Sequence, residues 1–213
     1  GRAIVVSSGG RLVPEIERAG GEHIRLPVNS KNPIRILINS RVISSLVLAK
    51  GVDIIHARSR APAWSALLAA RRTNRKFVTT FHGTYNENNS LKSYYNSVMT
   101  RGDVVIAISE FIAGHIRKKY GVPKNVLRVI HRGVDLERFS LTNISENRVE
   151  ALARKWRLPD GVPVIMLPGR LTRWKGQEVF IQAIKKTGLN NLKCLIVGSD
   201  QGRDAYRASL EKL

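Results

Sequence analysis

The sequence has almost no means of covalent cross-linking and no segment that could span a membrane. Of its 213 residues only Cys194 is a cysteine, so no disulfide can form within the chain. Cys194 lies in the apolar run 192–197, which predicts a core thiol in a reducing compartment. No apolar run approaches the roughly 18 residues of a spanning helix, and the opening run 3–6 is too short for a signal peptide. We therefore expect a soluble protein that at most attaches to a membrane surface.

Acidic and aromatic residues are also scarce. The 16 Asp and Glu are outnumbered by 36 Lys and Arg, and the net charge of +20 favours anionic partners such as nucleic acid, anionic lipid or phosphorylated small molecules. Aromatics make up 6% of the residues, and no helix-turn-helix, RNA-recognition or zinc signature is visible, which argues against nucleic acid. The five histidines lack metal-ligand spacing, so no metal is expected. The basic residues at 71–76 and 117–119 form either solvated helix ends or a surface for anionic lipid.

Hydrophobic periodicity predicts strands that alternate with helices along the whole chain. Strands are expected at 3–8, 24–27, 53–56, 77–81, 103–108, 126–131, 164–167 and 193–197, and helices at 12–18, 33–50, 62–72, 91–99, 111–120, 145–156, 177–186 and from 203 onward. The segment 83–90 is expected to be a polar loop. The nearly uninterrupted apolar run 103–108 predicts burial on both faces, which is typical of a parallel sheet with helices on each side. We therefore predict an α/β fold of two Rossmann-like, doubly wound parallel-sheet units, with a first domain at 1–140 and, at 141–213, a linker helix and part of a second.

The stretch Gly169–Gly176 follows an expected strand and precedes an expected helix. A helix N-terminus together with the basic side chains of Arg170, Arg173 and Lys175 suits a phosphate-bearing ligand. The stretch is not a P-loop, because Lys175 comes before the second glycine, and the chain has no GxGxxG motif. The residues alone leave two interpretations open, a phosphate site and a solvated basic turn.

Three other turns follow expected strands, at the sheet edge where ligands bind in this class of fold. Their candidate residues are His82 and Gly83, Ser109 and Glu110, and Gly133 and Asp135. Each also has a purely structural interpretation, as a satisfied histidine, a helix cap or a turn.

Five motifs stand in a characteristic order along the chain: Asp53–His56, Phe81–Gly83, Asp103–Glu110, Val129–Asp135 with Phe139, and Gly169–Leu171 with Lys175–Gly176. This order resembles that of glycosyltransferase family 4, a family of retaining sugar transferases built from two Rossmann domains, the GT-B fold. The resemblance covers essentially all of the chain. It implies a bacterial enzyme that transfers a sugar from a nucleotide-sugar donor to a hydroxyl acceptor, often a growing lipopolysaccharide, capsule or glycolipid.

The resemblance also implies roles for individual residues. It places Arg170 and Lys175, beside Gly169, on the donor diphosphate, where they would stabilise charge on the leaving group. It places His82 near the donor sugar as the catalytic residue, in a cleft between the two domains. Residues expected along that cleft are Gly83, Ser109, Glu110, Gly133 and Asp135. Because the basic pair does the work of a metal, no cofactor is expected. The expected partners are a nucleotide-diphosphate sugar, a lipid-linked or saccharide acceptor and an anionic membrane surface, with a cytoplasmic location, peripheral on the inner membrane.

Two parts of the family pattern are not found. Family members normally begin with an earlier strand and a glycine-rich loop, and the first domain of this chain, on the acceptor side, begins at what resembles a later strand. They also carry two glutamates at a fixed spacing that hold the donor ribose and sugar, and no pair of glutamates here has that spacing. We therefore expect a fragment or degenerate product of a longer transferase, inactive by itself. Two alternatives stay open: a non-catalytic remnant that binds a nucleotide sugar or a partner, and, less favoured, a basic nucleic-acid-binding protein.

Overall fold

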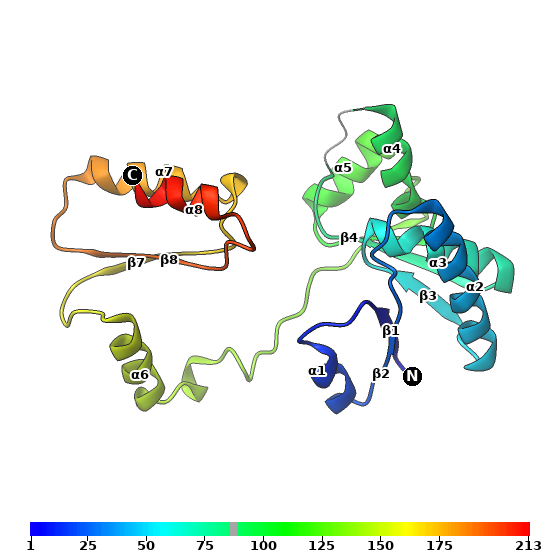
Figure 1. Ribbon diagram of the computed structural model, residues 1–213, viewed down its shortest axis with the longest axis horizontal. Helices are drawn as coiled ribbons and strands as arrows, with labels where there is room; N and C mark the ends of the chain where they lie inside the picture. The colour runs from blue at the N-terminus through cyan, green and yellow to red at the C-terminus, as the bar shows by residue number, and fades with distance from the viewer. Residues whose placement is uncertain (86–88) are drawn as a thin grey trace. The chain divides into compact units, whose positions relative to one another are not determined.

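The chain folds into two compact units of parallel strands and helices. The structure, a computed structural model, describes residues 1–85 and 89–213 and divides the chain into unit 1, Gly1–Gly133, and unit 2, Val134–Leu213 (Figure 1). The predicted α/β class with parallel sheets is confirmed in both units. The predicted polar loop 83–90 lies partly outside the described residues. The predicted domain junction after residue 140 lies a few residues beyond the boundary between the units.

Unit 1 contains two parallel sheets. Strands β1 and β2 form the smaller one, and β3, β4, β5 and β6 form the larger one in that order. The elements are β1 Ile4–Ser7, α1 Val13–Arg18, β2 Glu22–Arg25, α2 Pro33–Ala49, β3 Ile54–Ala57, α3 Arg60–Thr73, β4 Lys76–Phe81, α4 Ser90–Asn96, the 3-10 turn η1 Ser97–Thr100, β5 Val104–Ala107, α5 Glu110–Tyr120 and β6 Leu127–Val129. Because the strands are parallel, the carboxyl ends of β3 to β6 meet at one edge of the larger sheet.

Side-chain caps fix the starts of α2 and α5 in unit 1. The Asn32 Oδ1 atom accepts hydrogen bonds from the backbone N–H groups of Ile34 at 2.9 Å and Arg35 at 3.2 Å. Ser109 Oγ accepts one from the N–H of Ile112 at 3.3 Å. Both caps satisfy donors that the first helical turn leaves unpaired. The sequence predicted both starts correctly.

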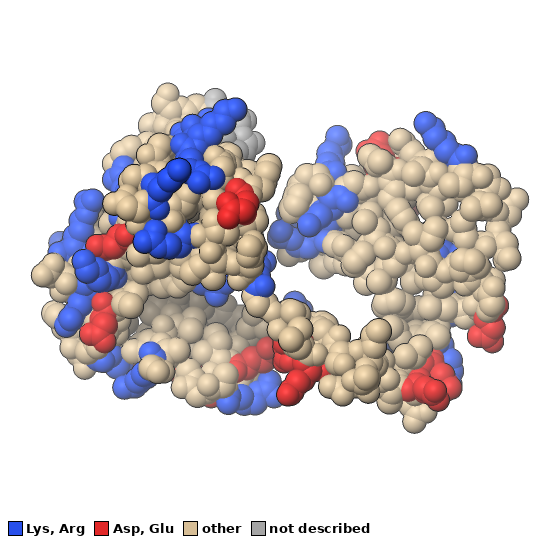
Figure 2. Space-filling view, turned by 180° about the vertical axis from the view of Figure 1, so that it is seen from behind, with Lys and Arg blue, Asp and Glu red and all other residues tan. Residues whose placement is uncertain are grey.

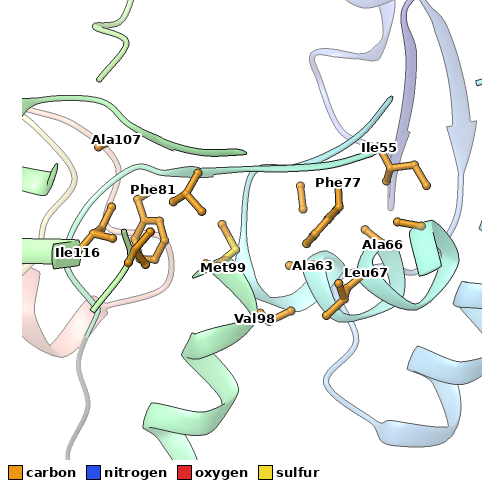
Figure 3. Close-up of a cluster of buried hydrophobic side chains, with 14 of the residues drawn as sticks. Ile55, Ala63, Ala66, Leu67, Phe77, Phe81, Val98, Met99, Ala107 and Ile116 are labelled. Carbon is orange, nitrogen blue, oxygen red and sulfur yellow. The ribbon is translucent and has the colours of Figure 1, made fainter. Parts of the chain in front are cut away.

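The core of unit 1 lies on one face of the larger sheet. There Phe77 and Phe81 of β4 pack with side chains of α3, η1 and α5, among them Leu67, Met99 and Ile116 (Figure 3). All five of these side chains are almost completely removed from solvent.

The opposite face of the larger sheet is less covered. In β5, Val105 and Ala107 are fully buried, whereas Val104 and Ile106 are only half-buried. The expectation of burial on both faces of 103–108 is therefore wrong, because α3, η1 and α5 all pack on the same side. This half-covered face forms the floor of a groove.

Unit 2 is a smaller βαβα arrangement. Its elements are the 3-10 turn η2 Leu141–Asn143, α6 Glu146–Trp156, β7 Val164–Pro168, the 3-10 turn η3 Arg173–Lys175, α7 Gln177–Thr187, β8 Lys193–Val197 and α8 Asp204–Glu211. Strands β7 and β8 pair in parallel as a two-stranded sheet. Cys194 of β8 is half-buried, so its assignment as a core thiol is wrong. Ile165, the residue of β7 that pairs with Cys194, is 40% exposed. A sheet of two strands has too few neighbouring side chains to bury these residues completely.

In the part of the chain that the structure describes, no helix is both long enough and apolar enough to cross a membrane.

Candidate functional site

A groove of about 550 Å³ lies at the carboxyl edge of the larger sheet in unit 1. Its apolar floor is formed by Ile106, Ile108 and Ile130. Its polar lining comes from the ends of three strands and consists of His56, Arg58, Thr80, His82, His131, Arg132 and Gly133. His56 and Ile106 occupy alternate strand positions that face away from the core, so the groove opens on the half-covered face. This is the edge at which parallel α/β sheets bind ligands.

His82 lies at the centre of this lining, between two arginines. The Nη2 atom of Arg132 is 2.9 Å from its Nδ1 atom, and the Nε atom of Arg58 is 3.4 Å from its Nε2 atom. Partial burial lowers the pKa of His82 below its usual value, and the positive charges of Arg58 and Arg132 lower this pKa further. The imidazole is therefore neutral at pH 7.

His56 occupies the neighbouring position on β3. Its Nε2 atom and the hydroxyl oxygen of Thr80 are 2.7 Å apart. Desolvation lowers the pKa of His56, and the charge of Arg58 adds to this effect. The groove thus combines permanent guanidinium charges with neutral imidazoles.

The structure brings only some of the predicted site residues of unit 1 into this groove. His82 and Gly133 line it, and Gly83 follows His82 directly in the chain. Ser109 is engaged as the cap of α5, and Glu110 is the exposed first residue of that helix. Asp135 belongs to unit 2, where its Oδ1 atom accepts a hydrogen bond of 2.9 Å from the N–H of Arg138.

The basic stretch Gly169–Gly176 forms a loop in unit 2 that stays attached to β8. The N–H of Gly169 donates to the carbonyl of Val197 at 2.8 Å, and the N–H of Leu171 donates to that of Ser199 at 3.0 Å. The carbonyl of Arg170 accepts a hydrogen bond of 2.8 Å from Nε2 of Gln177. The Arg170 backbone is thereby held while its side chain stays exposed.

Lys175 lies in η3, the short 3-10 turn that comes between β7 and α7. Its aliphatic stem runs beside Gly169, where an added Cβ would be 3.7 Å from its Cδ atom. Its ammonium nitrogen is 4.5 Å from the ring centroid of Trp174. Gly176 adopts a φ of +77°, which ends η3 and lets α7 begin at Gln177 without a side-chain cap. The loop thus places cations beside a helix start with free N–H groups.

Two residues that support the loop were missed by the sequence interpretation. Gln177 is completely buried, and its Oε1 atom lies 3.4 Å from the Tyr206 hydroxyl. Gly198 follows β8, and a Cβ at this position would overlap the carbonyl oxygen of Gly169 and lie 2.6 Å from its carbon. Neither residue carries a local sequence signal, because both contacts join segments that are distant in the chain.

Charge is distributed broadly over unit 1. Figure 2 shows Lys and Arg side chains in several separate groups on the visible face of this unit, with few Asp and Glu between them. Within residues 1–85 and 89–213, no group of three or more His, Cys, Asp or Glu side chains could hold a metal ion.

Comparison with known proteins identifies the family. The sequence model described as Glycosyltransferase Family 4 matches residues 2–138. The chain belongs to glycosyltransferase family 4. Among its relatives in this group is the D-inositol 3-phosphate glycosyltransferase of Xylanimonas cellulosilytica, which is 25% identical over 181 residues, or 76% of this chain and 42% of that protein. The putative colanic acid biosynthesis glycosyltransferase WcaL of Escherichia coli is 30% identical over 115 residues, covering 52% of this chain and 25% of that protein.

Solved structures show the same GT-B fold. A glycosyltransferase from Rickettsia africae is 40% identical with a TM-score of 0.84, and the match covers 99% of this chain and 56% of that chain. Anabaena HepE in complex with UDP-glucose is 20% identical with a TM-score of 0.80, covering 99% of this chain and 57% of that chain. The chain therefore spans little more than half the length of these solved structures, and less than half that of the curated relatives.

Proposed function

We propose that this chain is part of a retaining glycosyltransferase that moves a sugar from a nucleotide-diphosphate donor to a hydroxyl acceptor. The observation that carries the proposal is the basic loop Gly169–Gly176, which follows a strand of a Rossmann-like unit in a family 4 chain. The fold similarity to HepE, which has been crystallised with UDP and with UDP-glucose, supports a nucleotide-sugar donor.

In this proposal the donor diphosphate binds at Arg170, Lys175 and Gly169. When the bond between the sugar carbon and the phosphate oxygen breaks, negative charge collects on the departing diphosphate. The planar Arg170 guanidinium can bind two oxygens at once, and Lys175 adds a point charge. Gln177 holds the backbone of Arg170, and the stem of Lys175 lies beside Gly169, so the loop backbone needs little reorganisation as the charge develops. These cations supply the charge that a metal would otherwise bring, so the proposal includes no metal cofactor.

The catalytic role is assigned to His82. A neutral imidazole carries one N–H donor and one lone pair, and it can therefore hydrogen-bond to a sugar or acceptor hydroxyl without adding a charge. The lowered pKa of His82 supports this role at neutral pH.

Isothermal titration of the 213-residue chain with UDP and with GDP tests the donor site. We expect saturable binding that weakens roughly tenfold in Arg170→Ala and in Lys175→Ala, since a hydrogen bond to a charged group contributes about 1.5 to 3 kcal/mol. Lys185→Ala, in the last turn of α7, removes the same charge away from the loop and should bind like the parent chain. Equal affinity in all three variants would contradict the proposal. If a longer form transfers sugar, the anomeric configuration of its product, read by proton NMR, tests retention.

The acceptor is proposed to be lipid-linked or a saccharide of the cell envelope, for which the name of the WcaL relative gives support. Docking on the cytoplasmic face of the inner membrane is proposed from α2, where Ile34 is 68% and Leu37 is 49% exposed. The basic last turns of α3 and α5 lie in the same unit. Sedimentation with vesicles tests this: pelleting with anionic but not with zwitterionic vesicles is expected, and Ile34→Ser with Leu37→Ser should reduce it. Equal pelleting with both kinds of vesicle would contradict it.

A further inference from the structure

The groove of unit 1 holds two guanidiniums whose charge the protein does not neutralise. In the described part of the chain, neither Arg58 nor Arg132 forms an ion pair with a carboxylate, and no Asp or Glu lines the groove. Among the described residues, the side-chain hydrogen bonds of these two arginines go only to His82. Most other arginines that the structure describes also lack a carboxylate partner, and those that have one include Arg75 and Arg207. Arg58 and Arg132 differ in that both contact the same histidine in one groove.

One imidazole cannot satisfy both arginines. A neutral histidine has a single lone pair, because its other ring nitrogen carries a hydrogen. The 2.9 Å contact between Arg132 and Nδ1 uses that lone pair, which leaves Nε2 as an N–H group facing Arg58 at 3.4 Å. Donors then converge on the groove from Arg58 and His82 without an acceptor. A protonated imidazole would give three positive charges in contact, which is worse.

Arg58 and Arg132 are both exposed, so water can occupy their free donor positions. A ligand that displaces this water from the groove must accept several hydrogen bonds and carry negative charge. A phosphate monoester has three acceptor oxygens and a charge of about −1.5 to −2 at pH 7, which matches two guanidiniums. A carboxylate, with one charge and two oxygens, would leave one guanidinium without a counter-charge. The isoleucine floor beside these donors provides an apolar surface for the rest of such a molecule.

We propose that Arg58 and Arg132, with His82 between them, bind a phosphate monoester carried by the acceptor. This inference rests on the proposed transferase function and adds to it the chemical class of the acceptor. The proposed phosphate site belongs to unit 1, whereas the loop assigned to the donor diphosphate belongs to unit 2. In this arrangement the N–H of His82 orients the phosphate-bearing acceptor in the groove, which takes the place of a hydrogen bond from His82 to a hydroxyl.

The test uses NMR of the imidazole protons of the full 213-residue chain. Glycerol 3-phosphate is titrated against glycerol as the neutral probe and glucuronate as the carboxylate probe. Glycerol 3-phosphate should shift the His82 signal in a saturable manner, while glycerol does not shift it and glucuronate does so only weakly. Arg58→Gln and Arg132→Gln should each weaken binding roughly tenfold or more. Arg35→Gln, which removes an equal charge from an exposed position of α2, should leave binding unchanged.

Arg58→Lys separates a binding effect from a folding defect, because it keeps the charge and removes the planar guanidinium. This variant should bind glycerol 3-phosphate more weakly than the parent chain and should unfold at the same urea concentration. Failure of glycerol 3-phosphate to shift His82, equal binding of glucuronate, or equal weakening in Arg35→Gln would each overturn the proposal. So would a UDP-induced shift of His82 that is lost in Arg58→Gln, because the groove would then hold the donor. The donor site at Arg170 has its own test. If Arg170→Ala loses UDP binding but still binds glycerol 3-phosphate, both the donor site and the phosphate site are supported.

Discussion

The buried amide of Gln177 offers the sharpest test of how the donor loop is held. Gln177 is completely removed from solvent, and its amide hydrogen-bonds to the Arg170 carbonyl at 2.8 Å and to the Tyr206 hydroxyl at 3.4 Å. Gln177→Leu keeps the side-chain size and removes both bonds. The first bond is short and partly buried, so it contributes about 1 kcal/mol, and the carbonyl it leaves unpaired adds a further cost. The second bond is long and adds little. We expect unit 2 to lose about 1 to 2 kcal/mol of unfolding free energy.

Urea unfolding followed by tryptophan fluorescence measures this loss. In a Trp64→Phe background, the two remaining tryptophans lie in unit 2, so the signal reports on that unit alone. Gln182→Leu, on the exposed side of the same helix, is the matched control. A looser Arg170 should also weaken UDP binding several-fold, since about 1.4 kcal/mol corresponds to a factor of ten. If Gln177→Leu unfolds at the same urea concentration as Gln182→Leu and binds UDP as well, the argument that this amide fixes the loop is wrong.

Three further perturbations test other parts of the fold. Gly198→Ala should destabilise unit 2 by about 1 to 3 kcal/mol or more in urea unfolding, because the new methyl group overlaps the Gly169 backbone. Asn32→Ala should cost about 1 kcal/mol through loss of the α2 cap, measured by circular dichroism during urea unfolding. The folded-state pKa values of His82 and His56 lie below 6.5, so below that pH the unfolded chain binds more protons than the folded chain. The free energy of unfolding should therefore fall as the pH drops from about 6.5 through the folded-state pKa values.

Each of these has its own control. Gly114→Ala, in α5 with open space around its Cα, should not destabilise the protein. Ser145→Ala should cost less than the Asn32 change, because Ser145 precedes α6 without making a side-chain cap bond. Replacement of His56 and His82 by glutamine should flatten the pH dependence. Equal effects in test and control variants, or an unchanged pH slope, would count against the corresponding interpretation.

Local sequence signals predicted the elements well, because each depends on residues close together in the chain. Asn32 before a proline and Ser109 before an apolar run gave the starts of α2 and α5, since the cap bonds reach only two or three residues ahead. Strand β2 begins at Glu22 rather than Ile24, because its position is set by pairing with β1, where the N–H of Glu22 donates to the carbonyl of Ala3. The hydrophobic periodicity within one strand does not determine the register in which two strands pair.

The site was less predictable, because it is assembled across strands. His82 was found from its position after β4, but its contacts with Arg58 and Arg132 arise only when three strand ends meet at one edge. The burial of Cys194 was wrong for a related reason: an apolar pattern indicates a strand but not how many layers cover it. Charge composition predicts anionic partners in general, and it does not reveal that cations gather both in a loop of unit 2 and in a groove of unit 1.

The close approach of Gly169 and Gly198 has a consequence for protein engineering. The backbones of Gly169 and Gly198 lie in contact where β7 and β8 end, and Leu171 is hydrogen-bonded to Ser199. A change in the conformation of one of these two turns should therefore change the other. A substitution of residues 199–203 that is meant to alter ligand preference would also displace the basic loop Gly169–Gly176. Variants of this unit will therefore need both turns to be replaced together, with both segments taken from the same related protein.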